Sequence, residues 1–171
     1  MPRHAAEDGL TLIELLVGAF ILTVAIVALL DVLSRNVVLN DHTRNRSWAM
    51  SDANRVMERL REQNTGAACA TPSLAPPAGF PTWDLWLASA GAGGGGKSLP
   101  VNAGVQELVW VSPDPGAGSL KPVTVTVCWR DQGRVVGECQ WNGAQLQPND
   151  TDGNGIITGP ATLSTLMTCR R

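Results

Sequence analysis

The first third of the chain shows one helical pattern whose two halves differ in polarity. Residues 10–30 contain a single charged side chain, Glu14, and residues 15–30 contain none. At about 1.5 Å of rise per residue, this stretch spans roughly 30 Å, which matches the hydrocarbon thickness of a bilayer. The pattern therefore predicts a helix over residues 10–30 whose surroundings are lipid or other apolar helices.

From residue 31 the helical pattern continues but becomes amphipathic. Apolar residues recur at helical spacing on one face, while arginines and carboxylates alternate over the rest. Asn64-Thr65-Gly66 supplies a stop signal, so we predict one helix from Leu10 to about Gln63. Its amphipathic half, with the stop signal, occupies residues 31–65. The predicted apolar face consists of Ala49, Ala53, Val56, Met57 and Leu60.

The charges on this amphipathic segment predict a solvated helix face. Arg55 and Arg59 lie beside Glu58 and Glu62 at spacings that permit exposed ion pairs. Such pairs contribute only a few tenths of a kcal/mol each. A solvated face is therefore the preferred interpretation over a binding site.

Residues 66–171 form a smaller head for which we predict an antiparallel sheet. After a loop-like stretch rich in proline and glycine, residues 107–111 form a short apolar run, and valines alternate with polar residues over 123–130. The turn Asp131-Gln132-Gly133 then leads into a second strand over residues 134–141, which completes a hairpin. The predicted class is α+β, with the long helix packed on a small antiparallel sheet.

Composition narrows the function classes. The 171 residues carry a net charge of −2 with 16% charged side chains, which argues against nucleic-acid binding through bulk electrostatics. The two histidines, His4 and His42, both lie outside the head, so no Ser/His/Asp or Cys/His set can form there. We expect no enzyme activity. The six tryptophans, five of them in the head, are expected in the core and on sheet faces.

All four cysteines lie in the head, which predicts two disulfide bonds and an oxidising compartment. Three pairings are open. We favour Cys128 with Cys139 inside the hairpin, and Cys69 with Cys169 between the helix exit and the C-terminal tail. A zinc site is the alternative, but the spacing lacks a C-x-x-C motif and no histidine lies nearby.

Two short motifs carry competing interpretations. Residues 91–98 match the letters of a phosphate-binding P-loop, but Pro100 follows closely and no helical pattern continues, so a flexible glycine-rich surface loop is preferred. Asp150, Asp152 and Asn154 occupy the first, third and fifth positions of a calcium-loop pattern. Ala161 stands where the pattern requires a bidentate Glu, so the alternative is a polar turn between strands.

Glu14 is the anomaly of the apolar segment. A carboxylate there costs up to about 3 kcal/mol on insertion scales, and no Lys or Arg lies within one helical turn. Its cation is therefore expected from another molecule or from a chain terminus. The surrounding residues Gly9-Leu10-Thr11-Leu12-Ile13-Glu14-Leu15-Leu16 resemble the class III signal of type IV prepilins and type II secretion pseudopilins.

This resemblance implies that residues 1–9 are a leader removed by prepilin peptidase. Cleavage would fall between Gly9 and Leu10 on the cytoplasmic side, with N-methylation of the new amine of Leu10. It also implies that Glu14 pairs with the N-terminal ammonium of a neighbouring subunit during filament assembly. Arginines follow the apolar segment, so a positive-inside count alone would place the head in the cytoplasm. The resemblance implies the opposite orientation, with the head outside the cytoplasm, and we adopt that orientation.

The resemblance implies a pilin-like fold and a structural function. The chain would be a single-pass inner-membrane protein with its head outside the cytoplasm, and then a subunit of a pilus or pseudopilus filament. Implied partners are other pilin subunits, prepilin peptidase, the inner-membrane assembly platform and membrane lipid. Residues 125–131 resemble the pilus-modification minor pilins, which favours a minor pilin.

Three alternatives stay open. Within the family, the chain could be a type II secretion pseudopilin or a competence pilin for DNA uptake. Outside the family, it could be a signal-anchored extracytoplasmic binding module that depends on calcium.

Arg170-Arg171 form a small basic patch that could touch DNA or a neighbouring subunit, although a solvated tail is the simpler interpretation.

Overall fold

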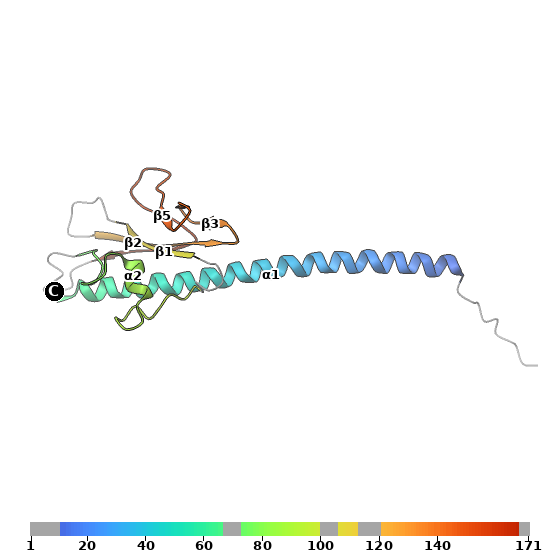
Figure 1. The fold of residues 1–171 in the computed structure, drawn as a ribbon, viewed down its shortest axis with the longest axis horizontal. Helices are drawn as coiled ribbons and strands as arrows, with labels where there is room; N and C mark the ends of the chain where they lie inside the picture. The colour runs from blue at the N-terminus through green and yellow to red at the C-terminus, as the bar shows by residue number, and fades with distance from the viewer. Residues whose placement is uncertain (1–10, 67–72, 100–105, 113–120, 168–171) are drawn as a thin grey trace, which may run out of the picture. The chain divides into compact units, whose positions relative to one another are not determined.

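The computed structural model describes residues 11–66, 73–99, 106–112 and 121–167. By its internal contacts the chain divides into two units, Met1–Thr43 and Arg44–Arg171. The helix α1, Leu12–Gln63, is continuous and contributes to both units. Figure 1 shows the chain's elements in order, with α1 as the long helix at the N-terminal end of the described chain.

The predicted end of the helix is confirmed. The Asn64 side chain donates to the carbonyl of Leu60 at 2.7 Å, and the Thr65 hydroxyl donates to the carbonyl of Glu62 at 2.8 Å. These side chains satisfy carbonyls of the last turn, which no longer have intrahelical partners. Gly66 then adopts a left-handed conformation with φ 62°.

A four-stranded antiparallel sheet forms the centre of the second unit. Its middle strand is β2, Lys121–Asp131, which pairs on one side with β1, Gln106–Ser112. The other side of β2 pairs first with β6, Ala161–Met167, and then with β3, Arg134–Val136. The α+β class is therefore confirmed: one long N-terminal helix and a small antiparallel sheet.

The predicted return strand over residues 134–141 is wrong in its extent. It is divided into β3 and β4, Cys139–Trp141, and β4 belongs to a separate two-stranded sheet with β5, Leu146–Pro148. The break falls at Gly137, which has φ 102° and lies so close to β2 that an added Cβ would be 2.8 Å from Sγ of Cys128. A residue with a side chain would neither adopt this φ easily nor fit.

Cys128 of β2 and Cys139 of β4 form a disulfide bond. The favoured pairing is thus confirmed, but the bond joins two sheets instead of crossing one hairpin. Cys69 and Cys169 lie outside the described residues, as do Gly9, Leu10 and Arg170-Arg171.

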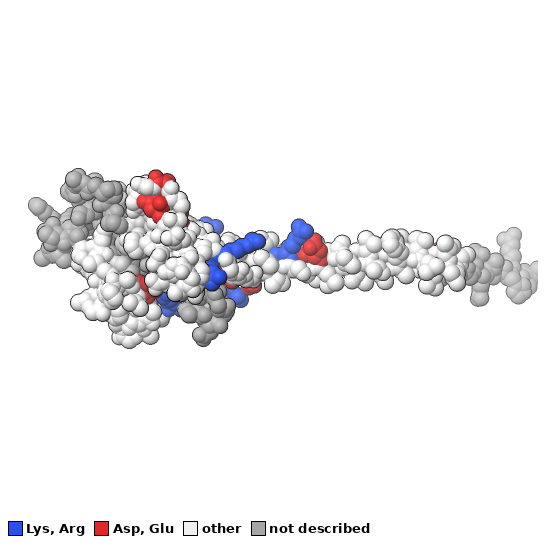
Figure 2. All heavy atoms as spheres, turned by 45° about the horizontal axis from the view of Figure 1, so that its top comes forward, with Lys and Arg blue, Asp and Glu red and all other residues white. Residues whose placement is uncertain are grey.

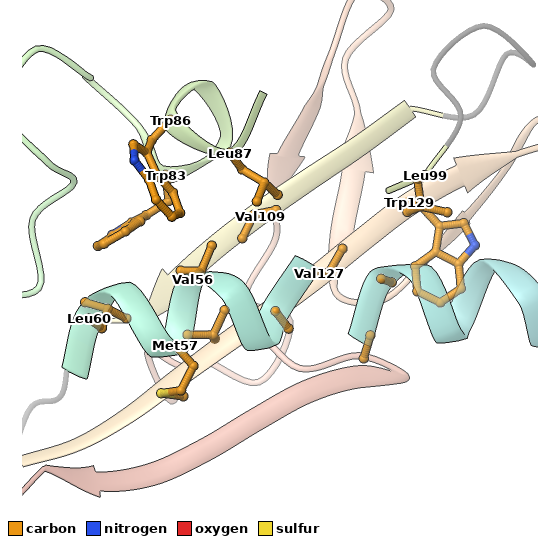
Figure 3. Close-up of a cluster of buried hydrophobic side chains, with 14 of the residues drawn as sticks. Val56, Met57, Leu60, Trp83, Trp86, Leu87, Leu99, Val109, Val127 and Trp129 are labelled. Atoms are coloured by element: carbon orange, nitrogen blue, oxygen red, sulfur yellow. The ribbon is translucent and has the colours of Figure 1, made fainter. Parts of the chain in front are cut away.

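Two apolar layers cover the faces of the main sheet. On one face, buried valines of β2 and Trp129 meet the apolar face of α1, whose predicted members are all buried (Figure 3). On the other face, Cys128 packs with Leu146 and Ile157 in a smaller cluster. The alternation along β2 therefore serves two layers rather than one core and one solvated face.

Sequence patterns missed a second helix. Trp83–Ala88 forms α2 inside the stretch that we expected to be a loop. Thr82 caps it by accepting a hydrogen bond from the amide of Leu85, as an N-cap residue does. Trp83 and Trp86 are buried and meet edge to face at 5.5 Å, which supports the expectation that tryptophans serve the core.

Candidate functional site

The first unit presents an uncovered apolar surface. Every large apolar side chain of α1 from Leu12 to Leu39 is at least half exposed. Within the described residues, α1 is the one helix long and apolar enough to cross a membrane. The face of this segment seen in Figure 2 carries no charged side chain over most of its length. A continuous apolar surface of this size requires lipid or apolar partners.

Glu14 is an exposed carboxylate within this apolar surface. No cation of the described residues lies within ion-pair distance of it, and the first arginine along the helix is Arg35, about 30 Å away at helical rise. Arg35 itself pairs with Asp31 at 2.9 Å. Any cation that pairs with Glu14 would come from outside the described part of the chain.

The second unit holds a buried polar cluster on the apolar face of α1. Asp52 is fully buried, and its carboxylate accepts hydrogen bonds from the Arg55 guanidinium and from the backbone amide of Ser98, the latter at 2.7 Å. Arg55 also donates to the Ser98 hydroxyl at 2.6 Å. The expectation of a solvated side chain is wrong for Arg55, which bonds to Asp52 and is 31% exposed, whereas Arg59 and Glu62 form an exposed ion pair at 3.0 Å as predicted.

The P-loop-like segment encloses this arginine. The second terminal nitrogen of Arg55 donates to the carbonyls of Gly94 and Gly96, at 2.9 and 2.6 Å. A phosphate-binding loop directs backbone N–H groups toward an anion, whereas here carbonyl oxygens surround a cation. The loop therefore presents acceptors to a cation, the opposite of what nucleotide binding requires. The bonds from Arg55 fix the loop to α1.

We predict that Gly94→Ala destabilises the second unit by about 1–3 kcal/mol through overpacking. An added Cβ would meet the carbonyl oxygen of Trp86 and would lie 2.8 Å from Cα of Leu87. Chemical denaturation followed by tryptophan fluorescence measures the change. Gly91→Ala is the matched control, since nothing lies within 4 Å of its Cβ position. Equal stability of the two variants would contradict the close packing of the loop.

The same loop carries Lys97 to the edge of β1. Its ammonium pairs with Asp84 of α2 at 2.7 Å and donates to the backbone carbonyl of Glu107 at 3.0 Å. Glu107 is buried, and burial, reinforced by the adjacent Asp52 carboxylate, raises the pKa of Glu107 to about 9. Two helices, one loop and one strand thus meet at a group of buried and half-buried ionisable side chains.

The predicted calcium residues lie together in the loop between β5 and β6. The two carboxylate oxygens of Asp150 accept from the amides of Gly153 and Gly155, at 2.8 and 2.7 Å. Asp152 accepts from Asn154, and the Asn154 side chain accepts from the amide of Ile156 at 2.6 Å. The amide of Gly155 is the main cause that lowers the pKa of Asp150. These are the local hydrogen bonds of a polar turn.

Calcium binding by this loop stays a prediction. Each carboxylate oxygen retains a second lone pair for an ion. Binding would raise Tm on addition of millimolar calcium, and Asp150→Asn would remove that rise. A Tm that does not respond to calcium would leave the polar turn as the sole role of these residues.

Several buried polar residues were not found by pattern analysis. Asp52 lies at helical spacing from Ala49, Ala53 and Val56. A carboxylate on the predicted apolar face was therefore a visible sign of a buried polar group. Glu107 lies two residues before the buried Val109 of β1, so strand spacing marked its face, but its charged neighbours come from α1, α2 and the glycine-rich loop. Their assembly depends on contacts between distant segments.

No protein-family model matches this chain, and neither a curated protein nor a solved structure matches it.

Proposed function

We propose that this chain is a structural subunit of the pilin type, a minor pilin that enters a type IV pilus filament through the first half of α1. The observation that carries the proposal is Glu14, a lone carboxylate on an exposed apolar helix. In the proposed assembly its cation is the N-terminal ammonium of Leu10 on a neighbouring subunit, which follows cleavage after Gly9. Pairing inside an apolar layer removes the cost of two isolated charges.

The apolar surface supports the same proposal. Before assembly, lipid of the inner membrane covers residues from Leu12 onward; in the filament, equivalent helices of other subunits replace the lipid. The exchange keeps apolar side chains out of water in both states. One segment can then serve as membrane anchor and as assembly surface.

The second unit supports a head outside the cytoplasm. Its α+β arrangement, a long helix on a small antiparallel sheet, is consistent with a pilin-like fold. The disulfide between Cys128 and Cys139 fits an oxidising compartment. Prepilin peptidase and an inner-membrane assembly platform are the further partners of this proposal, which assigns no enzymatic step to the chain itself.

The mature N-terminus tests the proposal directly. The full chain, purified from membranes of cells that contain prepilin peptidase, is expected to begin with N-methylated Leu10 by mass spectrometry. The same chain from peptidase-deficient cells serves as control and should retain Met1. An intact Met1 in both strains would contradict the proposal and support the signal-anchored binding module.

A further inference from the structure

Two buried carboxyl groups meet between β1 and α1, and the proposed assembly function does not require them. Asp52 of α1 is fully buried and Glu107 of β1 is 7% exposed. Asp52 is a neighbour of Glu107 that adds to the effect of burial in raising its pKa, both by its negative charge and as a side-chain hydrogen-bond partner. Within the described residues, no N–H or O–H donor is placed to satisfy either oxygen of Glu107. A buried carboxylate without donors is strongly disfavoured.

The charges around this pair already balance without Glu107. Arg55 neutralises Asp52, and Lys97 neutralises Asp84. An ionised Glu107 would add a third anion to the group, buried and with no cation of its own. A carboxylate accepts hydrogen bonds only, so contact between two carboxyls is favourable when one of them holds a proton to donate. Since Asp52 is bound by Arg55 and Ser98, the proton belongs on Glu107.

We propose that Glu107 is a proton-binding site that clamps β1 to α1, its carboxylic acid donating a hydrogen bond to Asp52. Removal of this proton by hydroxide leaves two adjacent carboxylates that repel each other and weakens the clamp. β2 contributes the uncharged Trp129, which lies opposite Glu107 in the sheet register. The charged groups that face the site from the packed elements are Asp52 and Arg55 of α1, Asp84 of α2 and Lys97 of the loop.

The direction of the pH effect follows from proton binding in the folded and unfolded states. Folding raises the pKa of Glu107 from 4.5 to about 9, chiefly through burial. Between these values the folded chain holds a proton that the unfolded chain has released. This contribution to stability is fully present below pH 4.5, falls as pH rises, and levels off above about pH 9.

Infrared spectroscopy of the full chain in detergent micelles tests the protonation state itself. At pH 7 the wild type should show the carbonyl stretch of a buried carboxylic acid, and Glu107→Gln should lack it. Titration should remove the band with a midpoint near pH 9. Asp52→Asn should move that midpoint to lower pH, because the neighbouring negative charge is gone. Absence of the band from the wild type at pH 7 would overturn the proposal.

Thermal unfolding tests the clamp. Between pH 7 and 9.5 the wild-type Tm should fall by about 5–10 °C. Glu107→Gln keeps a hydrogen-bond donor for Asp52 but cannot ionise, so its Tm should fall much less. Glu58→Gln is the matched control: it removes an exposed carboxylate of α1 and should retain the wild-type slope. Equal slopes in wild type and Glu107→Gln would overturn the clamp, whatever the outcome for N-terminal processing.

Discussion

Glu14→Ala is expected to leave membrane insertion intact and to reduce incorporation into filaments by roughly 10- to 100-fold. Removal of the carboxylate makes the apolar segment a better membrane helix, since a charge within it costs free energy. In the proposed filament, however, the ammonium of a neighbouring subunit would lose its partner in an apolar layer. A loss of about 1.4–2.8 kcal/mol corresponds to the stated range.

The measurement compares the amount of chain in purified filaments with the amount in membranes. Asp31→Ala is the matched control, because Asp31 is also an exposed carboxylate of α1 but pairs with Arg35 of its own chain. It should enter filaments at the wild-type level. Normal incorporation of Glu14→Ala would refute the proposed pairing, and loss from the membrane fraction would refute the separation of insertion from assembly.

Asp52→Ala is expected to lower the free energy of unfolding of the second unit by about 3–5 kcal/mol, a large share of the stability of an ordinary domain. The substitution leaves the Arg55 guanidinium without its carboxylate and the backbone amide of Ser98 without an acceptor. The glycine-rich loop thus loses one of its bonds to α1, and Arg55, which holds the loop through two carbonyls, loses the carboxylate that fixes its side chain. Urea unfolding of the full chain in micelles, followed by tryptophan fluorescence, measures the loss.

Asp31→Ala provides the control for this prediction as well. The Asp31 and Arg35 side chains are 59% and 76% exposed, so their ion pair is screened by water and should contribute about 0.5 kcal/mol or less. Similar losses for Asp52→Ala and Asp31→Ala would contradict the structural role of the buried cluster.

The elements predicted with success all depend on local patterns. A helix repeats every 3.6 residues and a strand every two, so the bounds of α1 and the position of β2 followed from short windows. The return strand over residues 134–141 failed because its continuity depends on how closely Gly137 approaches Cys128 of another strand. Helix α2 was missed because it is short, and its aromatic side chains are buried against distant segments.

The residues of the candidate site likewise fall into those that local sequence could predict and those that it could not. The isolated charge of Glu14 and the pairing of Cys128 with Cys139 were open to prediction, since the first depends on its immediate neighbours and the second on a nearby turn. The inward position of Arg55 and the charged neighbours of the buried Glu107 could not be predicted from the sequence. A charged residue shows its own sign in the sequence, but its desolvation and several of its partners come from other segments of the fold. Ser98 is 43 residues from Arg55, and Asp52 lies on a different element from Glu107.

The sequence by itself thus determined a long helix with an apolar first half, one charge within that half, and a head built on a small antiparallel sheet; it favoured the disulfide between Cys128 and Cys139 among three possible pairings. Only the tertiary structure decided that a loop with P-loop letters encloses an arginine, and that two carboxyl groups share one buried site. The physical reason is the range of the interactions. Periodicity and turn chemistry act between neighbours, whereas hydrogen-bond direction and desolvation depend on the packing of distant segments.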